Sequence, residues 1–523
     1  MNSTSSAQLL VKNTLWVYAS KIFTQILGII ALILVIRKID VEMFGRFNLY
    51  ISLFFVFGIF SMSPTINVFR RFVPEIKERG RFRELSKVVL FGCLSAFLLM
   101  GLTAWLIWVL HEPLGRLFKI DDLSEMMPLF LSYVVLHGIQ SLFQTLLGSL
   151  LLHKVTSILN MVGSLIRTVC YLIFMEELSV RLLLYIEAGL ALLFAVPAMI
   201  CLSIWFYRFK MHTHKKMQEA SIEPARMVKY GALSLFNEIG SGVVGRTSDY
   251  YIVAAIGSST SVGFYAFASR LFSYFQKLLP VKEFLSVIRP VFISKFTKKH
   301  SNDEFMQVYN FIMKTMLPIY VFPGLFFFAL GRPVIEFVFD PKYLSAYWVS
   351  VVILFITVPM AFAMPLSLTV ELYERMEIKL YSKVVAVLSI IGGIMAMKTV
   401  GLVGVALVTL ACDWLKILLI WLMLKRHVSI HYEIGSLRGY ILSWTILAAG
   451  FYYLQLYVGS LLSLLLLSGL FCILFSFAIV WWHPFNDEDK ELLNKLGSKG
   501  KLGPVVRRVV VYLHGKKPRL LLT

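Results

Sequence analysis

The chain has 523 residues, of which 58% are hydrophobic and only 15% are charged. Soluble proteins are roughly 45–50% apolar and about 25% charged, so this composition, with a mean hydropathy of +0.76, excludes a soluble globular protein. The chain nevertheless carries a formal charge of +21. Such an excess is typical either of a nucleic-acid-binding protein or of a membrane protein whose cations lie in the loops on one side.

Long apolar runs follow one another along the whole chain, and each can cross a membrane as a helix of roughly 20 residues. They lie at about 14–36, 47–69, 88–110, 128–150, 155–175, 182–207, 230–256, 262–288, 308–330, 348–370, 380–400, 401–424, 440–458 and 460–482. Transmembrane β-strands are shorter and alternate polar with apolar residues. These runs therefore predict an all-α polytopic membrane protein with about 14 transmembrane helices. The first run is too long for a signal peptide and is interpreted as a retained span.

The positive charges are distributed unequally between the two sides of the membrane. If the N-terminus is cytoplasmic, 33 of the 51 Lys and Arg residues fall in cytoplasmic segments, nine fall on the opposite side and nine lie within spans. The positive-inside rule then places both termini in the cytoplasm, which requires an even number of spans. Because orientation and contact with anionic lipids account for most of the charge, we expect membrane lipids and no nucleic acid as partners.

Two short motifs recur in the second half of the chain, and both are displaced by nearly the same distance along the sequence. Gly45-x-Phe47 with Leu53-Phe54 recurs as Gly263-x-Tyr265 with Leu271-Phe272, and Phe118 with Leu123-Ser124 recurs as Phe339 with Leu344-Ser345. The common displacement superimposes the first six spans on the next six in the same orientation. Such parallel repeats are typical of transporters that bind substrate between the repeats.

The repeat predicts the organisation of the chain. The expected parts are an N-terminal six-helix lobe (1–207), a basic cytoplasmic linker (208–229), a C-terminal six-helix lobe (230–424), two extra helices (425–482) and a basic cytoplasmic tail (483–523).

Ionisable residues inside spans are costly to bury and are therefore candidates for function. One face of the first span carries Lys21 and Gln25, and one face of the seventh carries Glu238 and Asp249, with Arg246 at its edge. Almost the same displacement superimposes Lys21 on Glu238, and we predict that the two face each other across a central cavity. The alternative interpretation is a buried ion pair that only locks the two halves together.

Further cations lie on polar faces of other spans. Arg270 and Lys277 share a face of the eighth span, and Arg167 shares a face of the fifth with Ser157, Asn160 and Ser164. Arg246, Arg270 and Lys277 predict a cationic cavity suited to a phosphate or diphosphate head group or an acidic sugar. For Arg167 the alternative is snorkelling or local pairing near a helix end.

Four stretches of the chain carry a resemblance to a known family. They are Gly45-Arg46-Phe47, residues 263–270 (GFYAFASR), residues 339–346 (FDPKYLSA) and residues 401–409 (GLVGVALVT). In these stretches and in its fourteen spans the chain resembles the polysaccharide flippases. These are the O-antigen and exopolysaccharide translocases of the multidrug/oligosaccharidyl-lipid/polysaccharide exporter superfamily. At two positions this chain departs from the family pattern: it has Asp340 where Gly is commoner and Val405 where the family usually has Ala.

The resemblance implies a function and a location. A flippase of this kind moves a polyprenyl-diphosphate-linked oligosaccharide from the cytoplasmic to the outer leaflet of the inner membrane, by alternating access between two lobes. It implies no cofactor and no ATP hydrolysis, with a proton or sodium gradient as the candidate drive and polysaccharide assembly proteins as candidate partners. We expect Glu238 and Asp249 as the acidic residues of transport. Lys21, Arg246, Arg270 and Lys277 are the candidates for diphosphate contact, and only Arg270 falls on a recurrent family position.

Two alternatives remain open at the level of sequence. A polytopic glycan polymerase or ligase is an enzyme that usually carries a long external loop with catalytic charges. The longest external segment here, 111–127, has only about 17 residues, so we expect no enzyme. A drug exporter or other lipid exporter of the same superfamily is the second alternative, and the last two spans argue against the drug exporters, which typically have twelve.

Overall fold

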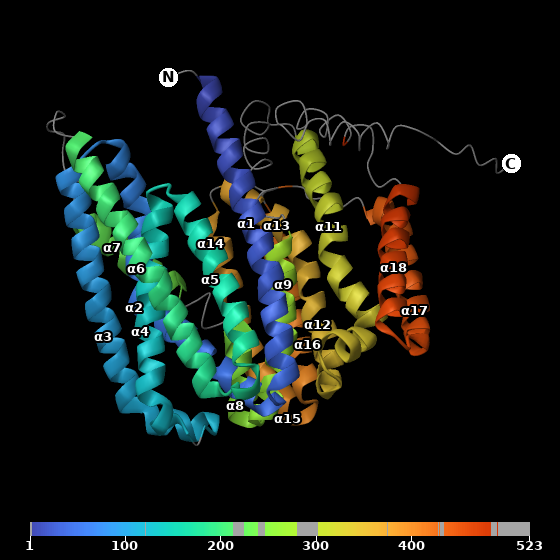
Figure 1. Ribbon diagram of the computed structural model, residues 1–523. Coiled ribbons are helices and arrows are strands. Elements are labelled where there is room, and N and C mark those ends of the chain that lie inside the picture. The colour runs from blue at the N-terminus through green and yellow to red at the C-terminus, as the bar shows by residue number, and fades with distance from the viewer. Residues whose placement is uncertain are drawn as a thin grey trace. The chain divides into compact units, whose positions relative to one another are not determined.

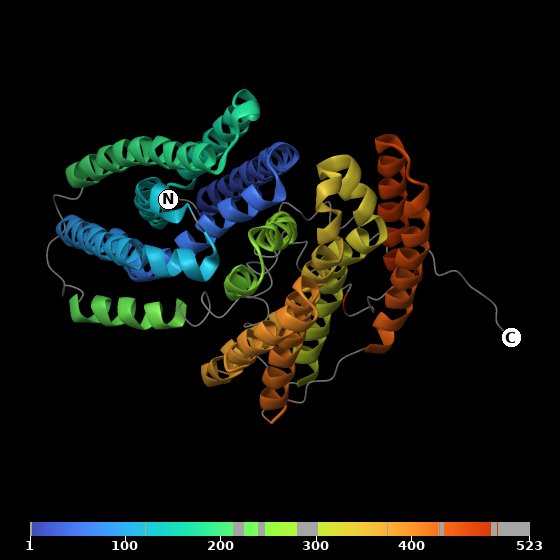
Figure 2. The same cartoon turned by 90° about the horizontal axis from the view of Figure 1, so that it is seen from below.

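The computed structural model describes residues 3–120, 122–212, 224–238, 246–279, 302–373, 375–426, 428, 434–482 and 489, and within these ranges the chain is helical throughout. It divides into two compact units (Figures 1 and 2). The N-terminal unit comprises Met1–Phe267 with Ile390–Val405, and the C-terminal unit comprises Ala268–Ser389 with Ala406–Thr523. The all-helical architecture predicted from the sequence is confirmed. The six-helix lobes and their boundaries stay a prediction.

Six long helices form most of the N-terminal unit. They are α1 (Ser3–Lys38), α2 (Val41–Glu78), α3 (Phe82–Phe118), α4 (Leu123–Ser149), α5 (His153–Ile173) and α6 (Val180–His212). The short η1 (Met175–Glu177) joins α5 to α6, and α7 (Pro224–Glu238), α8 (Arg246–Ile256) and the start of α9 (Ser259–Leu278) complete the unit together with Ile390–Val405. Helix α1 packs on α5, α4 packs on α6, and α2 packs on α3, α4 and α7. Aromatic and aliphatic side chains of α2, α3, α4 and α6 form a buried core between them.

Helix α11 is the centre of the C-terminal unit. The helices of this unit are α11 (Asn302–Pro333), η3 (Val334–Phe339), η4 (Pro341–Ala346), α12 (Tyr347–Phe355), α13 (Thr357–Leu372), α14 (Met376–Ser382), most of α16 (Leu402–Leu424), α17 (Ile434–Leu454), η5 (Gln455–Tyr457) and α18 (Leu461–Trp482); α15 (Val385–Thr399) is shared with the other unit. Helix α11 packs against α12, α13, α17 and α18. The core around it includes Trp444 of α17, whose ring stacks on Phe475 of α18.

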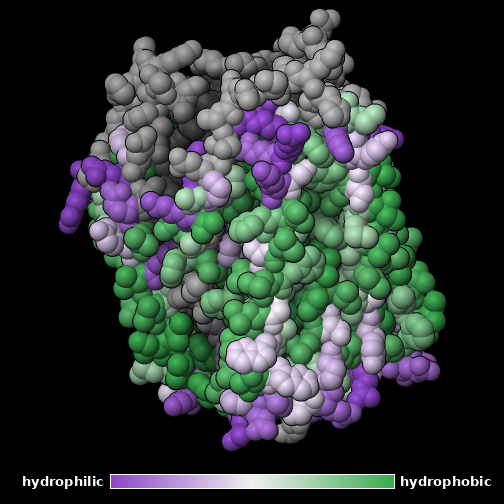
Figure 3. Space-filling view, turned by 90° about the vertical axis from the view of Figure 1, so that its left-hand side faces the viewer, coloured by the Kyte–Doolittle hydropathy of each residue, from purple (hydrophilic) through white to green (hydrophobic). Residues whose placement is uncertain are grey.

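The helices are long and apolar enough to cross a membrane. The described residues contain eleven such stretches, which coincide with eleven of the fourteen predicted spans. For the other three spans, the described helices α7 and α8, α9, and α17 cover parts of 230–256, 262–288 and 440–458, so the number fourteen is not confirmed. On the face shown in Figure 3, hydrophobic side chains form a broad band between two hydrophilic margins. The chain is a multi-pass membrane protein.

The repeated glycine motif marks a close helix crossing in the N-terminal unit. A Cβ atom on Gly45 of α2 would lie 2.0 Å from the carbonyl oxygen of Ser259 and 2.7 Å from the amide nitrogen of Gly263. A Cβ atom on Gly263 of α9 would lie 2.0 Å from the carbonyl oxygen of Val41. Because Ser259 and Gly263 are the repeat equivalents of Val41 and Gly45, the contact is reciprocal. Glycine lets the two backbones touch at this crossing.

Candidate functional site

A polar cluster lies inside the N-terminal unit, around an arginine of α5 and a glutamate of α6. The guanidinium of Arg167 binds the carboxylate of Glu187 through two contacts, Nη2 to Oε2 at 2.8 Å and Nε to Oε1 at 2.8 Å. The side chain of Glu187 is only 11% exposed, whereas that of Arg167 is 33% exposed. The first contact is a charge-assisted hydrogen bond and the second is a close ion-pair contact, and together they leave the two groups with no net charge.

Two further side chains complete this cluster. The hydroxyl of Tyr171, on α5, donates to Oε1 of Glu187 at 2.9 Å. The imidazole Nε2 of His137, on α4, lies 3.9 Å from Oε2 of the same carboxylate. Helix α5 therefore supplies two partners of Glu187, and α4 brings a third group to it. The arrangement holds the carboxylate and the guanidinium in fixed positions.

The hairpin of α5 and α6 explains why these charges meet. Arg167 lies six residues before the end of α5 at Ile173, and Glu187 lies seven residues after the start of α6 at Val180. Since the two helices run in opposite directions and pack on each other, the two side chains reach the same depth. At about 1.5 Å per residue this depth is roughly 10 Å from the turn.

A pocket of about 210 Å³ opens beside this cluster. Its polar side chains come from α1 (Thr24), α4 (Gln140) and α5 (Asn160, Ser164 and Arg167), and its apolar side chains come from α5 and α6 (Leu159, Val162, Leu190, Leu193, Phe194 and Pro197), with Gly163 also in the wall. Val162 and Leu193 are themselves exposed. Three residues of the polar face predicted for the fifth span, Asn160, Ser164 and Arg167, therefore line one pocket in the middle of apolar helices.

Amide and hydroxyl groups dominate the polar wall of this pocket. The Oε1 atom of Gln140 is buried and makes no hydrogen bond within the described residues. The same is true of Oε1 of the predicted residue Gln25, which follows Thr24 on α1 and is outside the pocket wall. A buried acceptor without a donor costs free energy, so it favours a ligand that brings hydroxyl or amide hydrogens. Neutral amides, a paired guanidinium and an adjacent phenyl ring, that of Phe194, suit a hydroxyl-rich group better than a bare cation. Within the described residues, three or more His, Cys, Asp or Glu side chains nowhere gather in a group that could hold a metal ion.

A second buried carboxylate lies between α8 and α9. Asp249 is 1% exposed and accepts a hydrogen bond of 2.6 Å from the hydroxyl of Tyr265, which is 0% exposed. The adjacent Tyr251 of α8 donates to the carbonyl oxygen of Ser52 of α2 at 2.7 Å. Asp249 is thus tied into the interior of the N-terminal unit. The side chain of Arg246, predicted to lie at the edge of the same helix face, is outside the described part of the structure.

The remaining predicted residues are placed by their helices. Lys21 lies on α1, where its Nζ is 5.6 Å from the centre of the Tyr18 ring, and Glu238 is the last residue of α7. Arg270 and Lys277 lie on the part of α9 that belongs to the C-terminal unit; Arg270 is half-buried and Lys277 is exposed. That Lys21 faces Glu238 stays a prediction, as does the cationic cavity.

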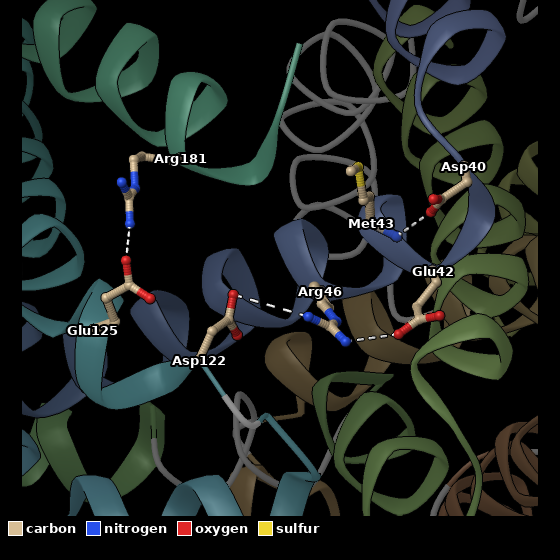
Figure 4. A network of polar contacts seen from close by, with 7 residues as sticks. All are labelled: Asp40, Glu42, Met43, Arg46, Asp122, Glu125 and Arg181. Atoms are coloured by element: carbon tan, nitrogen blue, oxygen red, sulfur yellow. Dashed lines mark hydrogen bonds and ion pairs between the residues drawn. The ribbon is translucent and has the colours of Figure 1, made fainter. Parts of the chain in front are cut away.

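Charged side chains at one end of the N-terminal unit are paired with acids (Figure 4). Arg46 binds Glu42 at 2.7 Å and lies 3.9 Å from Asp122, and Arg181 binds Glu125. Figure 4 also shows Asp40, whose side chain accepts a hydrogen bond of 2.7 Å from the amide of Met43 and so caps α2. These cations belong to the end predicted to face away from the cytoplasm, where positive charge is sparse and is locally neutralised.

Sequence reasoning missed three members of the polar cluster. Glu187, Tyr171 and His137 all fall inside predicted spans, but none of them is among the residues predicted for the site. A carboxylate within an apolar run is itself a strong signal. Arg167 and Glu187 lie at similar distances from the turn between the fifth and sixth spans, and this similarity predicts that the two side chains meet.

Comparison with known proteins places this architecture. Residues 10–294 match the family of polysaccharide biosynthesis proteins. No curated protein sequence matches the chain. Among solved structures, the inward closed conformation of the lipid II flippase MurJ is similar with a TM-score of 0.62 at 15% identity, over 89% of this chain and 98% of MurJ. An inward-facing multidrug resistance MATE family transporter of the MOP superfamily gives 0.62 at 12% identity over 77% and 94% of the two chains. A MATE protein in the bent conformation gives 0.50 at 13% over 80% and 94%.

Proposed function

Because this chain belongs to the family of polysaccharide biosynthesis proteins, we propose that it flips a polyprenyl-diphosphate-linked oligosaccharide from the cytoplasmic to the outer leaflet of the inner membrane. The observation that carries the proposal is the pocket of α1, α4, α5 and α6, whose walls suit sugar hydroxyls although it lies within apolar helices. The fold shared with a lipid II flippase supports it.

The chemistry of the pocket fits the middle of a transport path. Amide groups of Gln140 and Asn160 can exchange hydrogen bonds with vicinal hydroxyls, and the ring of Phe194 offers an apolar face to a sugar ring. The Arg167–Glu187 pair is neutral as a unit. It therefore gives the pocket wall polar groups but does not bind an anionic substrate so tightly that its release would be blocked. Val162 and Leu193 leave an apolar rim beside which a lipid chain can lie.

In this mechanism the protein alternates between two states and performs no covalent chemistry. Lys21, Arg246, Arg270 and Lys277 are the proposed diphosphate contacts, and Glu238 and Asp249 the proposed groups that respond to a proton or sodium gradient. Polysaccharide assembly proteins are proposed as neighbours in the membrane. Both termini are proposed to be cytoplasmic.

Depletion of the protein in its host tests this function. We expect lipid-linked oligosaccharide to accumulate on the cytoplasmic face, measured by mass spectrometry and by its accessibility in right-side-out and inverted vesicles. Complementation with Asn160→Leu, which removes an amide from the pocket, should restore transport poorly. Thr156→Val is the matched control, because Thr156 lies one turn earlier on α5 and outside the pocket wall. A depleted strain with unchanged lipid-linked oligosaccharide on both faces would contradict the proposal.

A second candidate is a glycan polymerase or ligase. The same depletion separates the two, because loss of an enzyme would leave repeat units accumulating on the outer face instead of the cytoplasmic face. A drug exporter would leave the lipid-linked pool unchanged and alter resistance to toxic compounds.

A further inference from the structure

A fully buried ion pair lies in the C-terminal unit. The Nζ atom of Lys314, on α11, is 2.9 Å from Oδ2 of Asp489, and both side chains are only 1% exposed. Lys314 falls within Met306–Phe339, a stretch long and apolar enough to cross a membrane. Asp489 lies seven residues beyond Trp482, the end of α18. A residue of the C-terminal tail thus supplies the counter-ion of a lysine in a membrane helix.

Burial makes this lysine dependent on an anion. The neighbouring side chains of α11 belong to the apolar core of the unit, with Met313 at 0%, Met316 at 1% and Leu317 at 2% exposure. A charge taken out of water at such a position loses its hydration, and only a closely placed opposite charge with good geometry offsets that loss. The ammonium of Lys314 therefore favours an occupant with negatively charged oxygens, and here the occupant is a carboxylate of the same chain.

The composition of the tail singles out this carboxylate. All four acidic residues of 483–523 fall within 487–491, whereas nine Lys and Arg residues are spread over 490–519. The tail is otherwise strongly basic, and Asp489, which reaches Lys314, belongs to the only acidic run of its sequence. Because Asp489 is part of the same chain, it competes for the ammonium of Lys314 at a high effective concentration.

We propose that Lys314 is a binding site for the phosphate of an amphiphile, and that Asp489 occupies this site as a tethered competitor. The class of ligand rests on the proposed function, since the proposed substrate carries a diphosphate. Carboxylate and phosphate oxygens both accept hydrogen bonds from an ammonium group, and lysine is a common phosphate ligand. A diphosphate carries more negative charge than one carboxylate and can take its place. The phosphate can belong to the substrate or to an anionic membrane lipid.

Binding to the purified full-length protein tests the competition. The probes are farnesyl diphosphate, inorganic pyrophosphate and phosphatidylglycerol, each titrated into detergent-solubilised protein. Asp489→Asn removes the competitor's charge and is expected to tighten binding by about tenfold, the gain if the tail holds roughly nine-tenths of the sites. Adding Lys314→Gln to this variant should abolish the gain. Asp487→Asn makes the same charge change two residues away and should leave the wild-type affinity unchanged.

Cleavage by trypsin after Lys490 gives an independent readout. Lys490 follows Asp489 directly, so withdrawal of Asp489 from Lys314 should speed cleavage there. We expect faster cleavage in Asp489→Asn without any probe, and in the wild type when a probe binds. A response to farnesyl diphosphate and pyrophosphate assigns the site to a diphosphate, and a response to phosphatidylglycerol assigns it to a membrane lipid; either response supports the site. A response to none of the three overturns it.

The charge-swapped variant keeps the proposal falsifiable if Asp489→Asn does not fold. Lys314→Asp with Asp489→Lys preserves an ion pair but removes the cation from α11. Because the swap adds a second trypsin site after position 489, cleavage after positions 489 and 490 is counted together. This cleavage should stay as slow as in the wild type and should no longer respond to any probe. A retained response would overturn the site. A protein that behaves as expected in these assays but does not flip lipid-linked sugar would refute the proposed function alone.

Discussion

The crossing of α2 and α9 predicts that neither of its glycines tolerates a methyl group. In Gly263→Ala the new Cβ would lie 2.0 Å from the carbonyl oxygen of Val41, whereas ordinary contact begins at 3.4 Å. The two backbones would have to separate locally until the distance from this Cβ to the carbonyl oxygen rose from 2.0 Å toward 3.4 Å. Gly45→Ala meets the carbonyl oxygen of Ser259 at the same 2.0 Å. Because both obstacles are backbone atoms, no side chain can rotate away to relieve them.

The expected cost is that of overpacking a tightly packed interior, about 1–3 kcal/mol for each substitution. The contact is reciprocal, so separation forced by one methyl group also makes room for the other. The double variant Gly45→Ala/Gly263→Ala should therefore lose less stability than the sum of the two single variants. Gly189→Ala on α6 is the matched control, because a Cβ there meets no atom within 4 Å. In a helix interior this replacement should stabilise by about 0.5–1 kcal/mol.

Thermal unfolding in detergent, followed by the fraction of protein that remains monodisperse on size exclusion, measures these effects. Both crossing variants should melt below the wild type, and Gly189→Ala should melt at or above it. If Gly263→Ala were as stable as Gly189→Ala, or if the double variant showed the full sum of the two losses, the reciprocal backbone contact would be refuted.

Three further substitutions follow from named contacts. Glu187→Ala should destabilise the fold by about 3 kcal/mol, at the low end for a broken buried pair because Arg167 is a third exposed, and adding Arg167→Met should recover part of the loss in the same melting assay. Tyr265→Phe removes a hydrogen bond to the buried carboxylate of Asp249 and should cost about 1.5–3 kcal/mol; an unchanged melting temperature would contradict that contact. Asp40→Ala removes the cap of α2 and should cost about 1 kcal/mol, which Asp40→Asn should largely restore.

The helices were predictable because their signal is local. Runs such as 14–36 and 460–482 are continuous in hydrophobicity, and the structure places α1 and α18 over them. The run 348–370 looks uniform in the sequence, yet helix α12 ends at Phe355 and α13 begins at Thr357. Pro359 has no amide hydrogen to donate to the carbonyl of Phe355, so the interruption has a local cause that hydrophobicity alone does not report.

The polar contacts were predictable only over short separations. Arg167 and Glu187 lie 20 residues apart on adjacent helices, so their depths could have been matched from the sequence. Lys314 and Asp489 lie 175 residues apart, and no local pattern in either segment predicts that the two residues contact each other. The repeat located Gly45 and Gly263 as equivalent positions, but equivalence does not say that two positions touch.

Reconstituted translocation tests the central claim most directly. Purified full-length protein would be placed in liposomes that contain a fluorescently labelled polyprenyl-diphosphate-linked oligosaccharide, and a membrane-impermeant quencher would report the fraction on the outer face. We predict that the protein makes the inner pool accessible faster than in protein-free liposomes, and that Asn160→Leu slows this while Thr156→Val does not. A rate equal to that of protein-free liposomes, in preparations of monodisperse protein, would contradict the proposal that this chain is a flippase.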